Sequence, residues 1–392
     1  MRCEPNVAGR GVETRPQSSK RPFFRRKLPM LAATLLAALA VACGYGSTNY
    51  TPPPTVASEI FLVSNSSGDV SAFSAASGKL DMIAGSSAMF PPVLTQFAAE
   101  PTGMFLAAVS TAPTAVATLQ IANIAAGGKI TVAPLMNVVN HPVGLAISSL
   151  GVIAVTDTLH NSVQLMRMQN NALMQGASAA TGALPVDAAF SSDGSRLYVA
   201  NSGDGTISVF TVSMQSASLQ LMQTAALPVA AGEFLAAPVR VALSPAGNKF
   251  AATTPDGRLF VGNVSAMNGM LSGLTETQVA ANANLEEVVF DPSGQNVYTG
   301  DQDNGGIFAF TVNAGSVATP IAGSPFPTVA LPGGPTGMAF NSAGDHLYVV
   351  IGAQSAVYTF SRNAGNGSLT ATGDVVSSGG ILAGRIVRVA GY

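Results

Sequence analysis

Three charged residues occupy the same position in successive copies of an internal repeat. Asp187, Arg240 and Glu287 are each the third residue of a segment, and the segments begin at positions 185, 238 and 285. An arginine flanked by two carboxylates can bind a polar ligand, and a carboxylate in such a setting can activate water as a general base. Because only 10% of the chain is charged, these three residues are the first candidates for a binding or catalytic site.

The repeat that carries them is about 49 residues long. Its clearest copy contains a short apolar run at 185–190, a turn at Gly194, and further strand-like runs at 197–201 and 205–210. Related segments begin at positions 92, 142, 238, 285 and 335. Four-stranded units with this period are typical of propeller blades.

The two ends of the chain supply the halves of one more unit. Residues 384–389 match only the first strand of the unit, whereas residues 59–65 and 70–73 match the second and third strands. Pairing these ends would close a ring and leave no exposed strand edge. The sequence therefore predicts an all-β, seven-bladed β-propeller of four-stranded blades over residues 57–392, closed by the C-terminal strand. A count of six or eight blades is the alternative, because the unit from Pro142 shows blurred alternation.

The first strand of each unit is expected to line a central channel, since the innermost strands of a propeller crowd around its axis. The third and fifth residues of a strand point to the same side. The third residues are Leu94, Gly144, Asp187, Arg240, Glu287, Gly337 and Ile386. The fifth residues, which are mostly small, are Gln96, Ala146, Ala189, Ala242, Val289, Ala339 and Arg388. We expect Asp187, Arg240 and Glu287 to lie at equivalent heights near one channel mouth.

Two interpretations of this cluster fit the sequence. The three residues could bind a polar ligand, or they could form ion pairs that tie neighbouring blades together. Arg385 and Arg388, on the closing strand, either join the cluster or pair with acids across the seam. His141, directly before Pro142, is the nearest candidate for a histidine at the channel mouth and is otherwise a loop residue.

The turn and strand motifs resemble those of a known family. Phe190–Gly194 with Leu197–Asn201, Phe290–Gly294 with Val297 and Tyr298, and Phe340–Gly344 with Leu347–Val350 resemble the lactonase-like propellers, which include 6-phosphogluconolactonase-type enzymes and YVTN surface repeats. The resemblance implies a seven-bladed propeller and, on its enzymatic side, hydrolysis of sugar lactones. Its motifs consist of turn and core residues, so they are specific for the fold and carry little information on activity.

The enzymatic side of this resemblance implies residues that the chain lacks. Such enzymes show a Gly-Pro-Arg-His stretch at the start of a blade strand and an Asn-Glu pair after a Tyr-Val strand. The corresponding stretches in this chain are Gly334-Pro335-Thr336-Gly337 and Val349-Val350-Ile351-Gly352. The missing Arg, His and Glu favour a binding module over a lactonase.

Sequence signatures of metal sites are weak. The segment Asp301-Gln-Asp303-Asn304 resembles the start of a calcium loop, but its twelfth position is Val312 instead of an acid. Asn-Ser-Gly-Asp sequences stand at the same place in other units, so we interpret the segment as a hairpin turn. We expect no metal site and no cofactor.

The N-terminus has the pattern of an export signal. Eight Lys or Arg residues lie in the first 30, and an uncharged apolar run extends from Leu28 to Ala42. The run ends in Leu-Ala-Val-Ala-Cys43, which resembles a bacterial lipobox, although Ala40 departs from the preferred Leu. We expect a lipoprotein-type signal at 1–42, lipidation of Cys43, and a flexible tether at 43–56. Ala40, Val41 and Ala42 also suit an ordinary signal peptidase, which would release a secreted protein.

These observations lead to a function expected at the bacterial cell envelope. The chain is expected to be a lipid-anchored propeller, on the periplasmic or outer-surface side, that binds a small molecule or a partner protein. A lactonase-like hydrolase with its site at the channel mouth is the alternative. We expect a monomer that contacts the membrane only through its lipid. The mature chain is mildly acidic, so its charge gives no basis for binding nucleic acid.

Overall fold

A computed structural model describes residues 59–91, 93–110, 118–133, 136–137, 141–169, 172–213, 216–328 and 333–390. The chain separates into two units, Met1–Pro54 and Thr55–Tyr392, and every described residue lies in the second. The predicted signal, Cys43 and the tether fall outside the described residues. Within the described ranges, no helix is long and apolar enough to cross a membrane.

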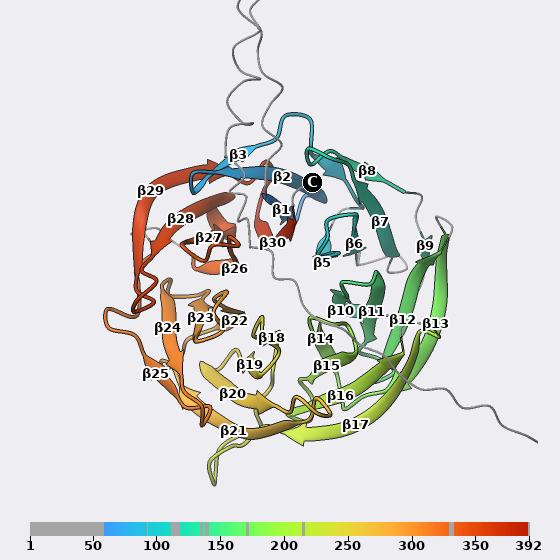
Figure 1. Ribbon diagram of the computed structural model, residues 1–392, viewed down its shortest axis with the longest axis vertical. Helices are drawn as coiled ribbons and strands as arrows, with labels where there is room; N and C mark the ends of the chain where they lie inside the picture. Colours follow the sequence, from blue (N-terminus) through green and yellow to red (C-terminus); the bar gives the residue numbers. More distant parts are fainter. Residues whose placement is uncertain are drawn as a thin grey trace, which may run out of the picture. The chain divides into compact units, whose positions relative to one another are not determined.

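Seven antiparallel sheets form a ring of seven blades (Figure 1). In each blade the strands follow one another from the channel outward, and every neighbouring pair is antiparallel. The unit from Pro142, whose alternation is blurred in the sequence, is a regular four-stranded blade. The predictions of an all-β fold and of seven blades are confirmed.

Blades 1 to 3 each extend from an innermost strand at the channel to an outermost strand at the edge of the ring. Blade 1 contains β30 (Ala383–Ala390), β1 (Glu59–Asn65), β2 (Asp69–Ala76) and β3 (Lys79–Met82), with β4 (Ala88–Met89) beside β2. Blade 2 contains β5 (Leu94–Ala99), β6 (Phe105–Ser110), β7 (Thr118–Ile124) and β8 (Ile130–Val132), with β9 (Met136–Asn137) beside β7. Blade 3 contains β10 (Pro142–Ile147), β11 (Val152–Asp157), β12 (Ser162–Gln169) and β13 (Ala172–Ala180).

The remaining blades follow the same order. Blade 4 contains β14 (Pro185–Phe190), β15 (Arg196–Asn201), β16 (Thr206–Ser213) and β17 (Ser218–Ala226). Blade 5 contains β18 (Arg240–Leu243), β19 (Lys249–Thr253), β20 (Arg258–Val264) and β21 (Leu271–Gln278). Blade 6 contains β22 (Leu285–Phe290), β23 (Asn296–Asp301), β24 (Ile307–Val312) and β25 (Ala318–Pro320). Blade 7 contains β26 (Pro335–Phe340), β27 (His346–Ile351), the 3-10 turn η1 (Gly352–Gln354), β28 (Ala356–Arg362) and β29 (Leu369–Ser377).

The two ends of the chain meet in blade 1. The C-terminal strand β30 pairs with β1, with Leu62 opposite Val387 and Ile60 opposite Val389. In Figure 1 the red β30 lies on the channel side of the blue β1. The predicted closure of the ring is therefore confirmed, and every blade keeps a paired innermost strand.

The apolar core is divided into seven clusters, one between each pair of neighbouring blades. The second strand of a blade contributes to two of them, because successive side chains point to opposite faces of a strand. In β15, Leu197 and Val199 pack against blade 3, whereas Tyr198 and Ala200 pack against blade 5. This double burial explains why the Leu-Tyr-Val-Ala motif is apolar throughout instead of alternating.

Buried tyrosines of the second strands also hold the blades together through hydrogen bonds. The hydroxyl of Tyr198 donates to the carbonyl of Gly269, at 2.7 Å, in the outer hairpin of blade 5. Tyr298 donates in the same way to Gly367 of blade 7, at 2.7 Å. Tyr348 donates to Gly78 of blade 1, at 3.1 Å.

Blade 5 has Ala251 at the tyrosine position, since Ala251 lies opposite Ala242 as Tyr198 lies opposite Ala189, and this blade uses a different contact. Lys249, which precedes Phe250, reaches into the outer hairpin of blade 6. Its ammonium donates to the carbonyls of Asn313, at 2.7 Å, and of Ala314, at 3.1 Å. The lysine therefore replaces the tyrosine as the bond between neighbouring blades.

Replacing Tyr198 with Phe tests these contacts between blades. The substitution leaves the buried carbonyl of Gly269 without its donor, so we expect a loss of about 1–2 kcal/mol in the free energy of unfolding, measured with urea. Tyr358→Phe is the matched control, because among the described residues the Tyr358 hydroxyl donates only to Oε1 of Gln354, in the η1 turn of its own blade. We expect the control to change stability by less than about 0.5 kcal/mol. Equal losses in the two variants would contradict the role given to Tyr198.

Candidate functional site

The candidate site is built by the third residue of six innermost strands and by Arg240, the first residue of β18. The register sets these residues at one level: Asp187 lies opposite Ala200, Glu287 opposite Gly300, and Arg240 opposite Thr253. We call the seven residues at this level the charged ring. They are Arg385, Gln96, Gly144, Asp187, Arg240, Glu287 and Gly337, from blades 1 to 7 in order.

Two members of the ring differ from those that the sequence predicts. The sequence predicts Leu94 and Ile386 at this level, but Gln96 and Arg385 occupy it. Strand β5 begins at Leu94, two residues after the start inferred from Pro92, and β30 begins at Ala383, one residue before the inferred start. Counting from the wrong residue misplaces the level in these two strands, so the sequence leaves open whether Arg385 joins the cluster or pairs across the seam, and the structure places it in the ring.

Arg385 connects the ring across the channel. Its Nη1 donates to Oε1 of Gln96 at 2.7 Å and lies 3.9 Å from Oδ1 of Asp187. Its Nε lies 3.6 Å from Oε2 of Glu287. The Nε of Arg240 lies 4.0 Å from the same Glu287 oxygen. The structure therefore brings the predicted trio together and adds Arg385 and Gln96 to it.

The two glycines of the ring let the strands approach closely. A Cβ added to Gly144 would lie 2.8 Å from Cα of Asp187, and a Cβ added to Gly337 would lie 2.8 Å from the amide nitrogen of Ile386. Neither position has room for a side chain without moving the neighbouring backbone. Gly337 occupies the position at which the lactonase resemblance implies a histidine, so this chain has a close strand contact there instead.

The charges of the ring are buried, and some of their polar atoms are unsatisfied. Asp187 is 2% exposed and Glu287 is 5% exposed. Within the described part of the chain, Oδ1 of Asp187, Oε2 of Glu287 and Nε of Arg240 have no hydrogen-bond partner. The ion-pair distances of 3.6 to 4.0 Å are longer than hydrogen bonds. Two buried acceptors and one buried donor of the ring thus take part in ion pairs but in no hydrogen bond among the described residues.

Burial decides the direction of the pKa shift for Glu287, whereas neighbouring carboxylates decide it for Arg385. Burial raises the pKa of Glu287 above its ordinary value, although Arg385 and Arg240 act to lower it. Burial acts to lower the pKa of Arg385, but the carboxylates of Glu287 and Asp187 raise it by more than burial lowers it. The net pKa lies above the ordinary value, so this guanidinium stays charged. Two arginines and two carboxylates give the ring a formal charge of zero.

Arg388 and His141 lie outside the contacts of the ring. Arg388 shares an open cavity of about 380 Å³ with Glu287 and Arg385, but its Nη1 pairs with Oε1 of Glu59 at 3.1 Å. His141 is exposed directly before β10, and its carbonyl accepts from the amide of Thr158 at 3.2 Å. Neither residue contacts the ring through an ion pair or hydrogen bond among the described residues.

The calcium-like segment forms a turn. Oδ1 of Asp301 accepts from the amides of Asp303, at 3.1 Å, and of Asn304, at 3.2 Å, as in a hairpin turn. Among the described residues, no group of three His, Cys, Asp or Glu side chains is placed to hold a metal ion.

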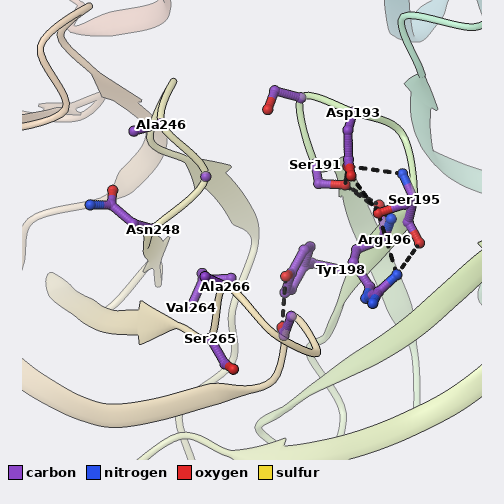
Figure 2. Close-up of a pocket in the computed structure, with 13 residues that line it drawn as sticks. Ser191, Asp193, Ser195, Arg196, Tyr198, Ala246, Asn248, Val264, Ser265 and Ala266 are labelled. Atoms are coloured by element: carbon purple, nitrogen blue, oxygen red, sulfur yellow. Dashed lines mark hydrogen bonds between the residues drawn. The ribbon is translucent and has the colours of Figure 1, made fainter. Parts of the chain in front are cut away.

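A separate cavity of about 350 Å³ lies between blades 4 and 5 (Figure 2). It is lined by the β14–β15 turn, where Asp193 accepts hydrogen bonds from Ser191 and Ser195, and these bonds lower the pKa of Asp193. Tyr198 and Gly269, joined by the hydrogen bond described above, also line this cavity. The matching residues around Tyr348 and Gly78 line a similar cavity between blades 7 and 1. We conclude that these grooves follow from the packing between blades and that the charged ring is the distinctive site.

Comparisons with known proteins identify the fold. No family model and no curated protein matches the sequence. Among solved structures, a "putative 6-phosphogluconolactonase" from Bacteroides fragilis is 16% identical with a TM-score of 0.70, over 86% of this chain and 100% of that one. The periplasmic gluconolactonase of Pseudomonas aeruginosa is 15% identical with a TM-score of 0.70, over 85% of this chain and 99% of that one. The chain therefore has the lactonase-like seven-bladed propeller fold, and at these identities the likeness concerns the fold alone.

The raised pKa of Glu287 predicts a pH-dependent effect of Glu287→Gln on stability. The folded protein binds a proton at this carboxyl more tightly than the unfolded chain, so the stability of the parent falls as pH rises through the shifted pKa. The variant lacks this group, and we expect its free energy of unfolding to increase relative to the parent between about pH 4 and about pH 8.

Asp345→Asn is the control without a pH-dependent effect in this range, because hydrogen bonds from Asn341 and His346 lower the pKa of Asp345 from its ordinary value of 3.8. The stabilisation by the ionised form is complete above that value, so the difference between this variant and the parent should stay nearly constant between about pH 4 and about pH 8. Urea unfolding at the two pH values measures both differences. A difference for Glu287→Gln that does not change with pH would show that burial does not govern this carboxyl.

Proposed function

We propose that this protein, a propeller of the lactonase-like fold, binds a neutral, hydroxyl-bearing small molecule at the charged ring. The observation that carries the proposal is the set of three unsatisfied buried atoms on Asp187, Glu287 and Arg240. Leaving such an atom without a hydrogen bond is unfavourable by about 1–3 kcal/mol. A ligand that forms these hydrogen bonds therefore gains binding free energy of the same order for each atom. Hydroxyl groups suit them, since one hydroxyl can donate to a carboxylate and accept from a guanidinium.

The charge of the ring selects against ionic ligands. The two arginines are already balanced by two carboxylates, and an added anion would face both Asp187 and Glu287 at close range. Like charges in a buried setting repel strongly. Sugars, sugar lactones and other polyols carry several hydroxyls without charge, and they are the ligand class that this arrangement favours.

Lactone hydrolysis is the second candidate function. It is favoured by the raised pKa of Glu287 beside two guanidinium groups, and by the lactonases among the proteins of similar fold. In such a reaction the Glu287 carboxylate would take a proton as a water oxygen bonds to the lactone carbonyl carbon. Arg240 or Arg385 would stabilise the oxyanion. The ester C–O bond would then break, and the ring oxygen would receive the proton to give an open-chain hydroxy acid.

A single titration series tests both candidates on residues 55–392, the unit that contains all seven blades and the closing strand pair. We expect methyl β-glucoside and glucono-1,5-lactone to raise the melting temperature, and gluconate to have no effect, because only ligands of the native state stabilise it. Asp187→Asn should weaken binding about 10- to 100-fold, the range expected on loss of one charged acceptor.

Asp193→Asn, in the cavity between blades 4 and 5, is the control and should leave binding unchanged. Acid release from the lactone, followed in a pH-stat, reports hydrolysis. Turnover that is lost in Glu287→Gln would establish the lactonase, whereas binding without turnover would establish the binding module. Failure of every neutral ligand to bind would refute the proposal.

We further propose that the protein is exported and held at the cell envelope by a lipid on Cys43. The support is the basic N-terminal segment, the apolar run before Cys43 and the absence of any other cysteine after residue 3. Expressed in a bacterial host, Cys43→Ser should move the protein from the membrane fraction to the soluble fraction. Cys3→Ser, within the predicted signal, should leave the distribution unchanged. Retention of Cys43→Ser in the membrane fraction would reject lipidation.

A further inference from the structure

A second level of residues lies three positions before each member of the charged ring. At four of these positions the carbonyl accepts from a loop amide of the same blade: Leu184 from Ser202 at 3.0 Å, and Asn284 from Gln302 at 2.9 Å. Leu382 and His141 accept equivalent bonds from the amides of Ser66 and Thr158, both at 3.2 Å. We call this level the rim. Its members, from blades 1 to 7, are Leu382, Val93, His141, Leu184, Ala237, Asn284 and Gly334.

Three rim residues are large, apolar and open to solvent. Leu382 is 58% exposed, Leu184 is 50% exposed and Val93 is 42% exposed. Each is followed along its own strand by a polar member of the charged ring, respectively Arg385, Asp187 and Gln96. Three residues of extended strand span about 10 Å. Along the backbone, the rim residues therefore precede the ring residues by about one small-molecule length.

The backbone at these three residues gives an independent reason to regard them as functional. Val93, Leu184 and Leu382 all have left-handed conformations, with φ of 64°, 50° and 51°. This conformation is unfavourable by about 1–2 kcal/mol for a residue with a side chain, and glycine adopts it freely. Turn geometry alone would thus favour glycine at all three positions. Exposed aliphatic side chains stand there instead, although they add little to the core.

We propose that the ligand of this propeller is amphiphilic. Its hydroxylated head occupies the charged ring, and an aliphatic substituent extends along the rim over Leu382, Val93 and Leu184. Alkyl glycosides and acylated polyols have this chemistry. The proposal rests on the proposed function, because it takes the head-group site from there and adds the class of substituent.

Three alkyl β-glucosides with the same head group and different chains test the proposal. Methyl, hexyl and octyl β-glucoside are titrated calorimetrically into residues 55–392, each below its micelle concentration. A fully buried methylene improves affinity about 4-fold, so a chain half-buried on the rim should gain about 2-fold per methylene. From methyl to octyl glucoside we expect about a 100-fold increase in affinity.

The triple variant Val93→Gly, Leu184→Gly and Leu382→Gly removes the apolar rim without disturbing the turns. It should bind octyl glucoside no more tightly than methyl glucoside, while its affinity for methyl glucoside stays that of the parent. Its urea midpoint should be unchanged or higher, because glycine fits the left-handed backbone. Leu150→Gly, a 63% exposed leucine in the β10–β11 turn at the other end of the strands, is the control and should keep the full dependence on chain length.

Each outcome separates this proposal from the proposed function. Equal affinity for methyl and octyl glucoside would overturn the amphiphilic ligand and leave the head-group site standing. A dependence on chain length that survives the triple substitution would also overturn it, because the chain would then lie elsewhere. Absence of binding by all three glucosides would overturn the proposed head-group site and, with it, the rim proposal.

Discussion

The structure depends on the packing of blade faces against each other. Because each second strand buries both of its faces, the apolar core is divided among seven interfaces between blades. Apolar burial of this kind is the dominant favourable contribution to folding. The innermost strands meet around the axis, where glycines at positions 144 and 337 allow close approach. The channel mouth can therefore carry residues that a conventional core would exclude.

The charged ring is better explained by binding than by stability. Removing two arginines and two carboxylates from water carries a desolvation penalty that their attraction repays only when the geometry is excellent. In this ring the ion pairs are 3.6 to 4.0 Å long, and three of the buried polar atoms have no hydrogen bond to any described part of the chain. By contrast, the contacts between blades through Tyr198, Tyr298 and Tyr348 are short and satisfied. The tyrosine hydrogen bonds thus connect neighbouring blades with favourable geometry, whereas the ion pairs of the charged ring are too long to do so.

Much of the fold and part of the site could be predicted from the sequence. The repeats that begin with Pro or Leu correctly predicted that Asp187, Arg240 and Glu287 share one level around the channel. The two half-units at the chain ends correctly predicted the closure of the ring. Gln96 was placed at the fifth position instead of the third, and Arg385 was expected either to join the cluster or to pair across the seam, because the strand starts were misplaced in their segments. The polar residue that ends several second strands, such as Asn65, Asp157, Asn201 or Asp301, would have corrected the position. The contacts of Arg385 with Asp187 and Glu287 depend on how the innermost strands meet around the channel, which the repeat pattern does not encode.

The most direct test is a crystal structure of residues 55–392 with methyl β-glucoside bound. The account predicts sugar hydroxyls within about 3 Å of Oδ1 of Asp187, Oε2 of Glu287 and Nε of Arg240, at hydrogen-bond distance from all three atoms. A sugar found only in the groove beside Ser191 and Asn248, or a channel mouth without bound sugar at saturating concentration, would contradict the assignment of the charged ring as a ligand site.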